Sequence, residues 1–220
     1  MYMQQLLSNN LTALAQVATS CVTTKVGNPN GPAPTLPPEC SSQSPNQSQG
    51  QSTGGSGSCS ITPGKVPLCK QWDPKWASHP YCNGNTMQSG ACGPTSLAMV
   101  MSFYLNKIIL PPDVADYISA NHWSICGGTD DQEMTLGPQH WGLKGKAVTW
   151  EQAKTYLKQG IPVIQVHGAG YFTGGGHFIV LTGVNSDGTY SVNDPDGKHR
   201  TSATEAQITA SLENSWVISK

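Results

Sequence analysis

QSGACGPTSLAMVMSFYL, residues 88–105, is the stretch on which the expected fold depends. A group of small residues precedes an apolar run from Leu97 to Leu105 that is broken by a single serine. Proline is favoured at the first position of a helix, so Pro94 predicts a helix start and places Cys92 at or just before its N-terminus. Because this helix is apolar on nearly all sides, we expect it to be buried at the centre of a domain.

Cys92 is the first candidate for a catalytic residue. Backbone N–H groups in the first turn of a helix are unpaired, and the helix dipole favours negative charge there. A thiol in this place is favoured as the thiolate, which is the nucleophilic form of cysteine. The structural alternative is a small buried cysteine that packs at a helix end, because cysteine is among the most buried residue types.

Charge excludes two classes of partner. The formal net charge is -1 and only 11% of the residues are charged. Nucleic acids and anionic membranes are bound chiefly by clustered positive charge, so we expect neither as a partner. Residues 1–20 carry no Lys or Arg and their apolar run is interrupted, which predicts neither a signal peptide nor a membrane span.

Seven cysteines indicate an oxidising compartment. No pair has the C-x-x-C spacing, which argues against zinc-ribbon and thioredoxin-like sites, and six histidines without i, i+4 pairs indicate no metal motif. The odd count suits three disulfides and one thiol, Cys92. Pairing of neighbours would join Cys21 with Cys40, Cys59 with Cys69, and Cys82 with Cys126. We therefore expect an extracytoplasmic, secreted or surface-bound protein without a metal or cofactor.

Composition divides the chain into three parts. Residues 1–21 have apolar side chains at helical spacing and predict a short amphipathic helix that packs on the main domain or on a partner. Residues 22–65 are rich in Pro, Ser, Gly, Asn and Gln without periodicity, which is typical of a linker. Residues 66–220 are long enough for one well-formed core.

The pattern within this domain changes from helical to alternating along the chain. We expect helices near residues 111–122 and 150–159, strands near 162–166, 177–184, 189–193 and 215–219, and irregular structure over 123–143. Capping-box patterns begin at Thr149 and Thr204. Helices first and an antiparallel sheet second predict an α+β fold.

His177 and Asp194 are the candidate partners of Cys92. His177 begins a strand directly after three glycines, and Asp194 follows the next strand. The Asp187–Gly188 turn joins these strands into a hairpin, so the start of one lies beside the end of the other. A catalytic thiol needs a base and a group that orients the base. The alternative for Asp194 is an ordinary turn residue before a proline.

Four motifs occur in order along the expected domain. They are QWDPKW at 71–76, TMQSGACGPTSLAMVMSFY at 86–104, GHFIVLTGV at 176–184 and VNDPDG at 192–197. On these motifs the chain resembles the C39-like peptidase family, the second C39-type group. The resemblance implies a papain-like cysteine peptidase fold, in which the nucleophile stands at the N-terminus of a central helix packed on an antiparallel sheet. It also implies Cys92 as nucleophile, His177 as base and Asp194 as the residue that orients it.

One position departs from the pattern of true C39 peptidases. These enzymes carry a glutamine six residues before the nucleophile as a donor to the oxyanion, and here that position is Thr86. Gln88, four residues before Cys92, is the expected donor, and Gln71 is another possibility. A solvent-exposed loop glutamine is the structural alternative.

Two functions of different classes follow from these patterns. The first is a thiol hydrolase that cleaves peptide or amide bonds in proteins or in the peptides of peptidoglycan. The second is a non-catalytic module of a surface or secretion assembly whose papain-like cleft binds a peptide. The presence of all three catalytic residue types favours the first, and a missing oxyanion donor would favour the second.

Overall fold

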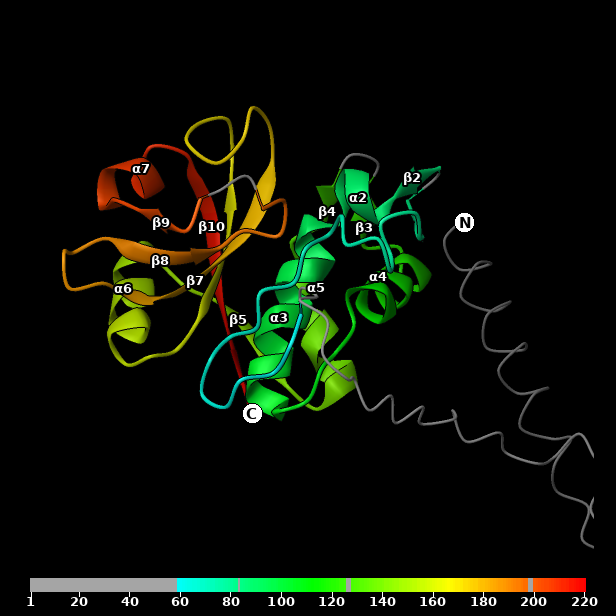
Figure 1. Cartoon of the computed structure of the whole chain (residues 1–220), viewed down its shortest axis with the longest axis horizontal. Coiled ribbons are helices and arrows are strands. Elements are labelled where there is room, and N and C mark those ends of the chain that lie inside the picture. The colour runs from blue at the N-terminus through cyan, green and yellow to red at the C-terminus, as the bar shows by residue number, and fades with distance from the viewer. Residues whose placement is uncertain (1–58, 83, 126–127, 198–199) are drawn as a thin grey trace, which may run out of the picture. The chain divides into compact units, whose positions relative to one another are not determined.

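A six-stranded antiparallel sheet with helices on both faces forms the domain (Figure 1). The computed structural model describes residues 59–220 apart from 83, 126–127 and 198–199. The helix expected over 1–21, most of the expected linker and the pairing of Cys21 with Cys40 lie outside the described residues.

Short elements precede the sheet, and most of the sheet strands come last. In chain order the elements are β1 (Pro80–Tyr81), β2 (Asn85–Thr86), α2 (Met87–Gly90), α3 (Cys92–Leu105), α4 (Pro111–Ala120), β3 (Ser124–Ile125), β4 (Gly128–Thr129), α5 (Gln132–Leu136), the 3-10 helix η2 (Gly137–Trp141), β5 (Lys144–Ala147), α6 (Trp150–Lys158), β6 (Val163–His167), β7 (His177–Val184), β8 (Tyr190–Asn193), β9 (Ser202–Ala203), α7 (Glu205–Thr209) and β10 (Leu212–Ser219). The strand order in the large sheet is β5-β10-β6-β7-β8-β9, and every pair is antiparallel.

Alternating side chains divide the core into two layers. On β6, Ile164 and Val166 belong to the cluster around α3, whereas Val163 packs with residues of α6 on the other face. Residues 92–102 of α3 are all buried, as expected for a helix that is apolar nearly all round. A central helix packed on an antiparallel sheet, the arrangement expected of a papain-like peptidase, is confirmed.

Most of the expected helices and strands are present. The main correction concerns residues 123–143, which were expected to be irregular. This region is not irregular throughout, because it contains β3, β4, α5 and η2. These elements have only two to five residues each, too few to give a periodic pattern. The edge strand β5 was also not expected, because its sequence KGKA is almost all exposed and does not alternate.

Gly145 on β5 allows the backbone of α5 to pack directly against this edge strand. A Cβ at Gly145 would lie 1.9 Å from the Met134 carbonyl oxygen. We therefore expect Gly145→Ala to destabilise the fold by about 3 kcal/mol, because backbone must shift to admit it. The matched control is Gly183→Ala on β7, where a Cβ meets nothing within 4 Å and the change should stay within about 0.5 kcal/mol. Urea unfolding measures both, and equal effects would contradict this packing.

A disulfide closes a short loop that precedes the first strand. Cys59 and Cys69 are bonded, with their Cα atoms 4.2 Å apart, so this one of the three expected pairings is confirmed. Cys126 lies outside the described residues, and its pairing with Cys82 stays a prediction. The bond joins a residue of the expected linker to the folded domain, as oxidising conditions would permit.

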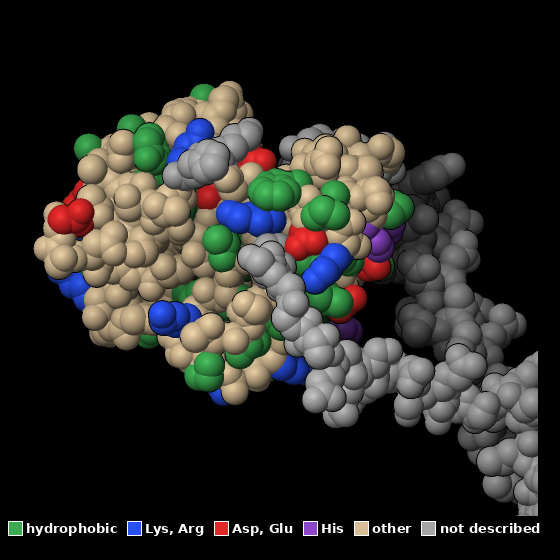
Figure 2. All heavy atoms as spheres, viewed as in Figure 1, with side chains coloured by type: hydrophobic (Ala, Val, Ile, Leu, Met, Phe, Trp, Pro, Cys, Tyr) green, Lys and Arg blue, Asp and Glu red, His purple; other side chains and the backbone are tan. Residues whose placement is uncertain are grey.

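Charged side chains of both signs are interspersed on the face seen in Figure 2, without one dominant patch. No helix in the described part of the chain has the length and hydropathy required to cross a bilayer.

Candidate active site

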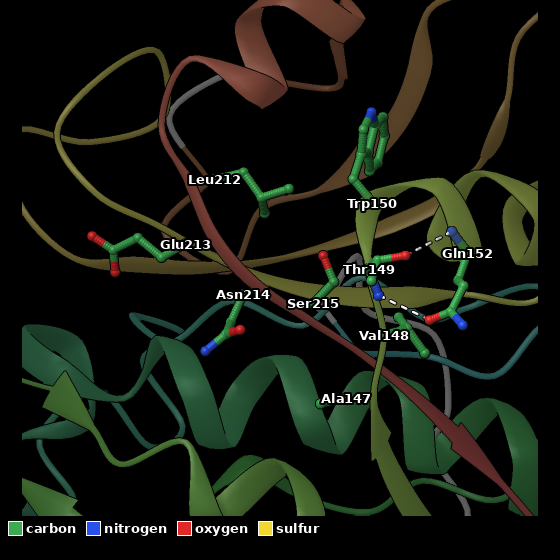
Figure 3. Close-up of a pocket in the computed structure, with 9 residues that line it drawn as sticks. All are labelled: Ala147, Val148, Thr149, Trp150, Gln152, Leu212, Glu213, Asn214 and Ser215. Carbon is green, nitrogen blue, oxygen red and sulfur yellow. Dashed lines mark hydrogen bonds between the residues drawn. The ribbon is translucent and has the colours of Figure 1, made fainter.

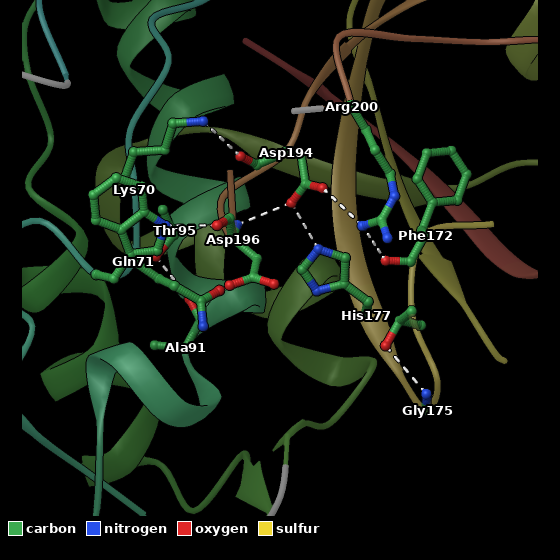
Figure 4. Close-up of polar contacts among 12 residues, drawn as sticks. Lys70, Gln71, Ala91, Thr95, Phe172, Gly175, His177, Asp194, Asp196 and Arg200 are labelled. Atoms are coloured by element: carbon green, nitrogen blue, oxygen red, sulfur yellow. Dashed lines mark hydrogen bonds and ion pairs between the residues drawn. The ribbon is translucent and has the colours of Figure 1, made fainter. Parts of the chain in front are cut away.

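The β7–β8 hairpin brings His177 and Asp194 together, as predicted. His177 is the first residue of β7, and Asp194 follows β8, whose last residue Asn193 pairs with Val180. The His177 Nε2 lies 2.8 Å from the Asp194 Oδ1 (Figure 4). Both side chains are buried. Packing therefore holds this pair in one geometry.

Cys92 reaches the same point from the central helix. It is the first residue of α3, and α3 packs on β7. Because Nε2 of His177 is engaged by Asp194, Nδ1 is the ring nitrogen left for an interaction with Cys92, which acts to raise the pKa of His177. The three residues expected to cooperate thus lie in the order thiol, imidazole and carboxylate.

Opposing effects set the protonation of the histidine and the aspartate. Burial would lower the pKa of His177, but hydrogen bonds and charges of Asp194 and Cys92 outweigh it and raise the pKa to about 9. Burial would likewise raise the pKa of Asp194, but the hydrogen bond and charge of His177 hold it below its ordinary value. At neutral pH the imidazole is therefore positively charged and Asp194 is ionised.

The segment around Gln71 is attached to the turn that follows β8. The Gln71 N–H donates to the Pro195 carbonyl over 2.9 Å, and the Lys70 ammonium donates to the Asp194 carbonyl over 3.1 Å. These contacts join residues more than 120 positions apart in the sequence. They place Gln71 beside the hairpin that carries His177 and Asp194.

The two glutamines considered as oxyanion donors differ in burial. Gln71 is 5% exposed, and its Nε2 donates to the Gln88 backbone carbonyl over 2.9 Å. This bond fixes which end of the amide is nitrogen, because only an N–H can donate to a carbonyl. The Gln88 side chain is exposed. Both glutamines contact the cleft, but only Gln71 is held in a defined position.

A cleft of about 250 Å³ is lined by both Cys92 and His177. Its polar lining includes Gln71, Gln88, Cys92, Thr173, His177 and Asp196. Glycines 90 and 176 complete part of the wall, so the chain backbone itself borders the cleft next to Cys92. Such a narrow, polar cleft suits an extended peptide backbone better than a bulky apolar ligand.

Arg200 connects Asp194 to the loop between β6 and β7. Its Nη1 donates to the Phe172 carbonyl and lies 3.7 Å from Asp194 Oδ2 (Figure 4). The guanidinium also lies 5.8 Å from the centre of the Tyr171 ring. This loop contributes Thr173 to the cleft, so Arg200 links the cleft wall to Asp194, the hydrogen-bond partner of His177. Nothing in the local sequence pattern indicated this role.

His167 is the neighbour of His177 on the adjacent strand β6 and does not line the cleft. It is fully buried, is paired with His177 across β6 and β7, and contacts Ser211 and Gln165 over 3.2 Å each. Burial, and then the charge of His177, lower the pKa of His167 to about 4. A neutral ring at this position avoids a second positive charge beside the His177 imidazole.

Glu133 on α5 carries a buried carboxyl group whose pKa is affected by the charge of Cys92. It is fully buried, and neither carboxyl oxygen has a hydrogen-bond partner among the described residues. Burial, and then the charge of Cys92, raise its pKa well above 4.5. A negative charge here would disfavour the thiolate, so the protonated form of Glu133 is the one compatible with a charged Cys92.

We expect Glu133→Gln to stabilise the protein increasingly as pH rises. The folded protein keeps a proton that the unfolded chain loses above about pH 4.5, so wild-type stability falls with rising pH until the folded pKa is passed. Glutamine has no proton to lose. The gain should be small at pH 4 and about 1–2 kcal/mol at pH 8. Urea unfolding at both pH values measures it, with exposed Glu213→Gln as control, and a constant difference would contradict the protonated state.

A larger hollow of about 350 Å³ lies elsewhere on the surface, between the start of α6 and β10 (Figure 3). Its lining includes Thr149, whose side chain caps α6, together with Trp150, Glu213 and Ser215. None of its lining residues is a cysteine or a histidine. The described part of the chain also gathers no group of three residues suited to hold a metal ion. The smaller cleft is therefore the candidate active site.

The comparison with protein families agrees with the resemblance read from the motifs. Among solved structures, the chain is similar to the peptidase domain of Streptococcus ComA, described as a bifunctional ABC transporter involved in a quorum sensing pathway. The identity is 16%, the TM-score is 0.46, and the match covers 59% of this chain and 90% of that one. No curated protein matches. Residues 64–220, well over half of the chain, match the family described as Peptidase_C39 like. The protein that carries this cysteine–histidine–aspartate arrangement therefore belongs to the Peptidase_C39 like family.

Proposed function

We propose that the protein is an extracytoplasmic cysteine peptidase that cleaves peptide or amide bonds through Cys92, His177 and Asp194. The observation that carries this proposal is the buried chain of contacts from thiol to imidazole to carboxylate at the base of a polar cleft. The Cys59–Cys69 disulfide supports an oxidising location. Proteins and the peptides of peptidoglycan are the substrates considered.

The chemistry divides into acylation and hydrolysis. The Cys92 thiolate attacks the scissile carbonyl carbon, and the carbonyl electrons move to oxygen. His177 then gives its Nδ1 proton to the leaving amine as the C–N bond breaks, which leaves a thioester on Cys92. Water attacks the thioester, His177 accepts its proton, and the acid is released with the thiolate restored. Asp194 keeps the imidazole in the required orientation throughout.

Gln71 is the oxyanion donor that best fits this scheme. The Cys92 backbone N–H, in the first turn of α3, is the second donor. An amide already held in place needs no reorganisation when negative charge develops on the substrate oxygen. Gln71 is buried and anchored on the Gln88 carbonyl, whereas an exposed Gln88 side chain would first have to be ordered.

Trapping with a peptide electrophile tests the proposal. A peptidyl vinyl sulfone should modify Cys92 in the native protein at neutral pH, as located by mass spectrometry. His177→Ala should react far more slowly, and Cys92→Ala should neither react nor hydrolyse peptide pools. Binding of peptides without modification of Cys92 would contradict the enzyme and favour a peptide-binding module.

We expect hydrolysis to fall as pH rises through about 9, where His177 loses the proton that the leaving amine requires. The decline should occur at lower pH in Asp194→Asn, because the hydrogen bond to the charged carboxylate contributes to the raised pKa of His177. Initial rates of peptide hydrolysis between pH 5 and 10 measure this. The same rate at pH 8 and pH 10 would show that His177 is not the proton donor.

A further inference from the structure

The Asp194 carboxylate has one oxygen that the contact with His177 does not use. Oδ1 accepts hydrogen bonds from His177 Nε2 over 2.8 Å and from the Asp196 N–H over 2.9 Å. Oδ2 is buried and has no hydrogen-bond partner among the described residues. A buried carboxylate oxygen without a donor is unfavourable unless a positive charge lies nearby. The orientation of this carboxylate therefore depends on what faces Oδ2.

Arg200 supplies positive charge to Oδ2. Its Nη1 lies 3.7 Å from this oxygen, within the range of an ion pair but beyond that of a hydrogen bond. The ammonium group of Lys70 is also near, but it donates to the Asp194 backbone carbonyl over 3.1 Å and so supports the main chain. Arg200 thus acts on the side chain of Asp194, at the oxygen that His177 does not contact.

The guanidinium is held in turn by the loop between β6 and β7. Its Nη1 donates to the Phe172 carbonyl (Figure 4), and its centre lies 5.8 Å from the centre of the Tyr171 ring. The Tyr171 hydroxyl donates to the Ser202 carbonyl over 3.3 Å. Contacts with a carbonyl and with a ring fix the guanidinium more firmly than either would alone, because fewer side-chain rotamers satisfy both.

The contacts of Arg200 form a closed circuit that returns to His177. Phe172 is 2% exposed, and the centre of its ring lies 4.5 Å from that of His167. His167 is fully buried and is paired with His177 across β6 and β7. The circuit is completed by the contacts of Asp194 with His177 and with Arg200. Arg200 can therefore restrict the Asp194 carboxylate although it is not among the residues that line the cleft.

We infer that Arg200 is a positioning residue, which holds the Asp194 carboxylate in the orientation that His177 requires. The inference rests on the proposed function, because it takes Asp194 as the group that orients His177. Since Arg200 acts through Asp194, its loss should slow the chemical step more than it weakens substrate binding. Lysine keeps the charge but has no planar fork to serve both Oδ2 and the Phe172 carbonyl, so it should restore only part of the rate.

A double-mutant cycle between Arg200→Met and Asp194→Asn tests this route of action. With Asp194 present, Arg200→Met should lower kcat for peptide hydrolysis about ten-fold and change KM less than about two-fold, while Arg200→Lys should lose about three-fold in kcat. In Asp194→Asn, Arg200→Met should change kcat by less than about two-fold, because the carboxylate on which Arg200 acts is gone. The rate of Cys92 alkylation by iodoacetamide at pH 6 should show the same pattern with smaller changes, and it requires no peptide substrate.

Lys154→Met is the matched control. Lys154 is also a partly exposed cation that pairs with carboxylates and lies near an aromatic ring, outside the cleft lining, and its loss should leave kcat unchanged in both backgrounds. Melting temperatures show whether each variant is folded in the assay. No loss in Arg200→Met, or the same fractional loss with either residue at position 194, would overturn the inference alone. Coupling in alkylation without any peptide hydrolysis would overturn the proposed function and leave the contact between Arg200 and Asp194 as the support of His177.

Discussion

At pH 6, Cys92 is expected to react with iodoacetamide about ten-fold or more faster in the wild type than in His177→Ala. The imidazole is charged at this pH, because the hydrogen bonds to Asp194 and Cys92 raise the pKa of His177 to about 9. A positive charge in contact with the sulfur, together with the first turn of α3, favours the thiolate. With alanine at position 177 the thiol reacts only in the alkaline range of ordinary cysteines.

Asp194→Asn should shift the alkylation profile in the same direction by a smaller amount. Asp194 acts on Cys92 only through His177, because its Oδ1 lies 2.8 Å from the His177 Nε2. The midpoints of the rate profile are assigned to Cys92 and His177 together and not to either residue alone. Rates from pH 4 to 10, read on the peptide that contains Cys92, compare the three proteins.

His79→Ala is the matched control for loss of a histidine. His79 pairs with Asp116 over 2.7 Å outside the cleft lining, and its removal should leave the profile unchanged. A wild-type profile that rises only at alkaline pH, or one that His177→Ala does not move, would mean that Cys92 is not an activated nucleophile. The peptide-binding alternative would then gain support.

Local sequence signals were sufficient to predict that Cys92, His177 and Asp194 lie close together. Pro94 indicates where α3 begins, and the Asp187–Gly188 turn sets the register of the β7–β8 hairpin. Each of Cys92, His177 and Asp194 stands at or directly beyond the end of such an element. The ends of helices and strands that have clear turn or capping residues can therefore be located without knowledge of the whole fold.

The surroundings of the triad depend on contacts that no local pattern reveals. Gln71 reaches the cleft because residues 70–72 bond to the turn after β8, more than 120 positions later. Arg200 is likewise important for its position between Asp194 and the loop after β6. Sequence spacing favoured Gln88 because it is near Cys92 in the chain, whereas burial favours Gln71.

Gln71→Ala is expected to lower kcat for peptide hydrolysis about 100- to 1000-fold, the usual loss for one preorganised oxyanion donor. KM should change little, because the donor acts mainly on the charge that develops in the transition state. Alkylation of Cys92 by iodoacetamide forms no oxyanion, so its rate should stay within about three-fold of the wild type. This difference separates loss of a donor from collapse of the site.

Gln88→Ala provides the matched control, since the contact between the two glutamines uses the Gln88 backbone carbonyl. Alanine keeps that carbonyl and therefore keeps Gln71 anchored, while it removes the exposed side chain. We expect a loss in kcat of less than about five-fold, because the oxyanion donors remain in place. Gln71→Glu keeps the shape but replaces the donor with a carboxylate, and should be at least as damaging as alanine. A large loss in Gln88→Ala with near-normal kcat in Gln71→Ala would reverse the assignment and return the oxyanion role to Gln88.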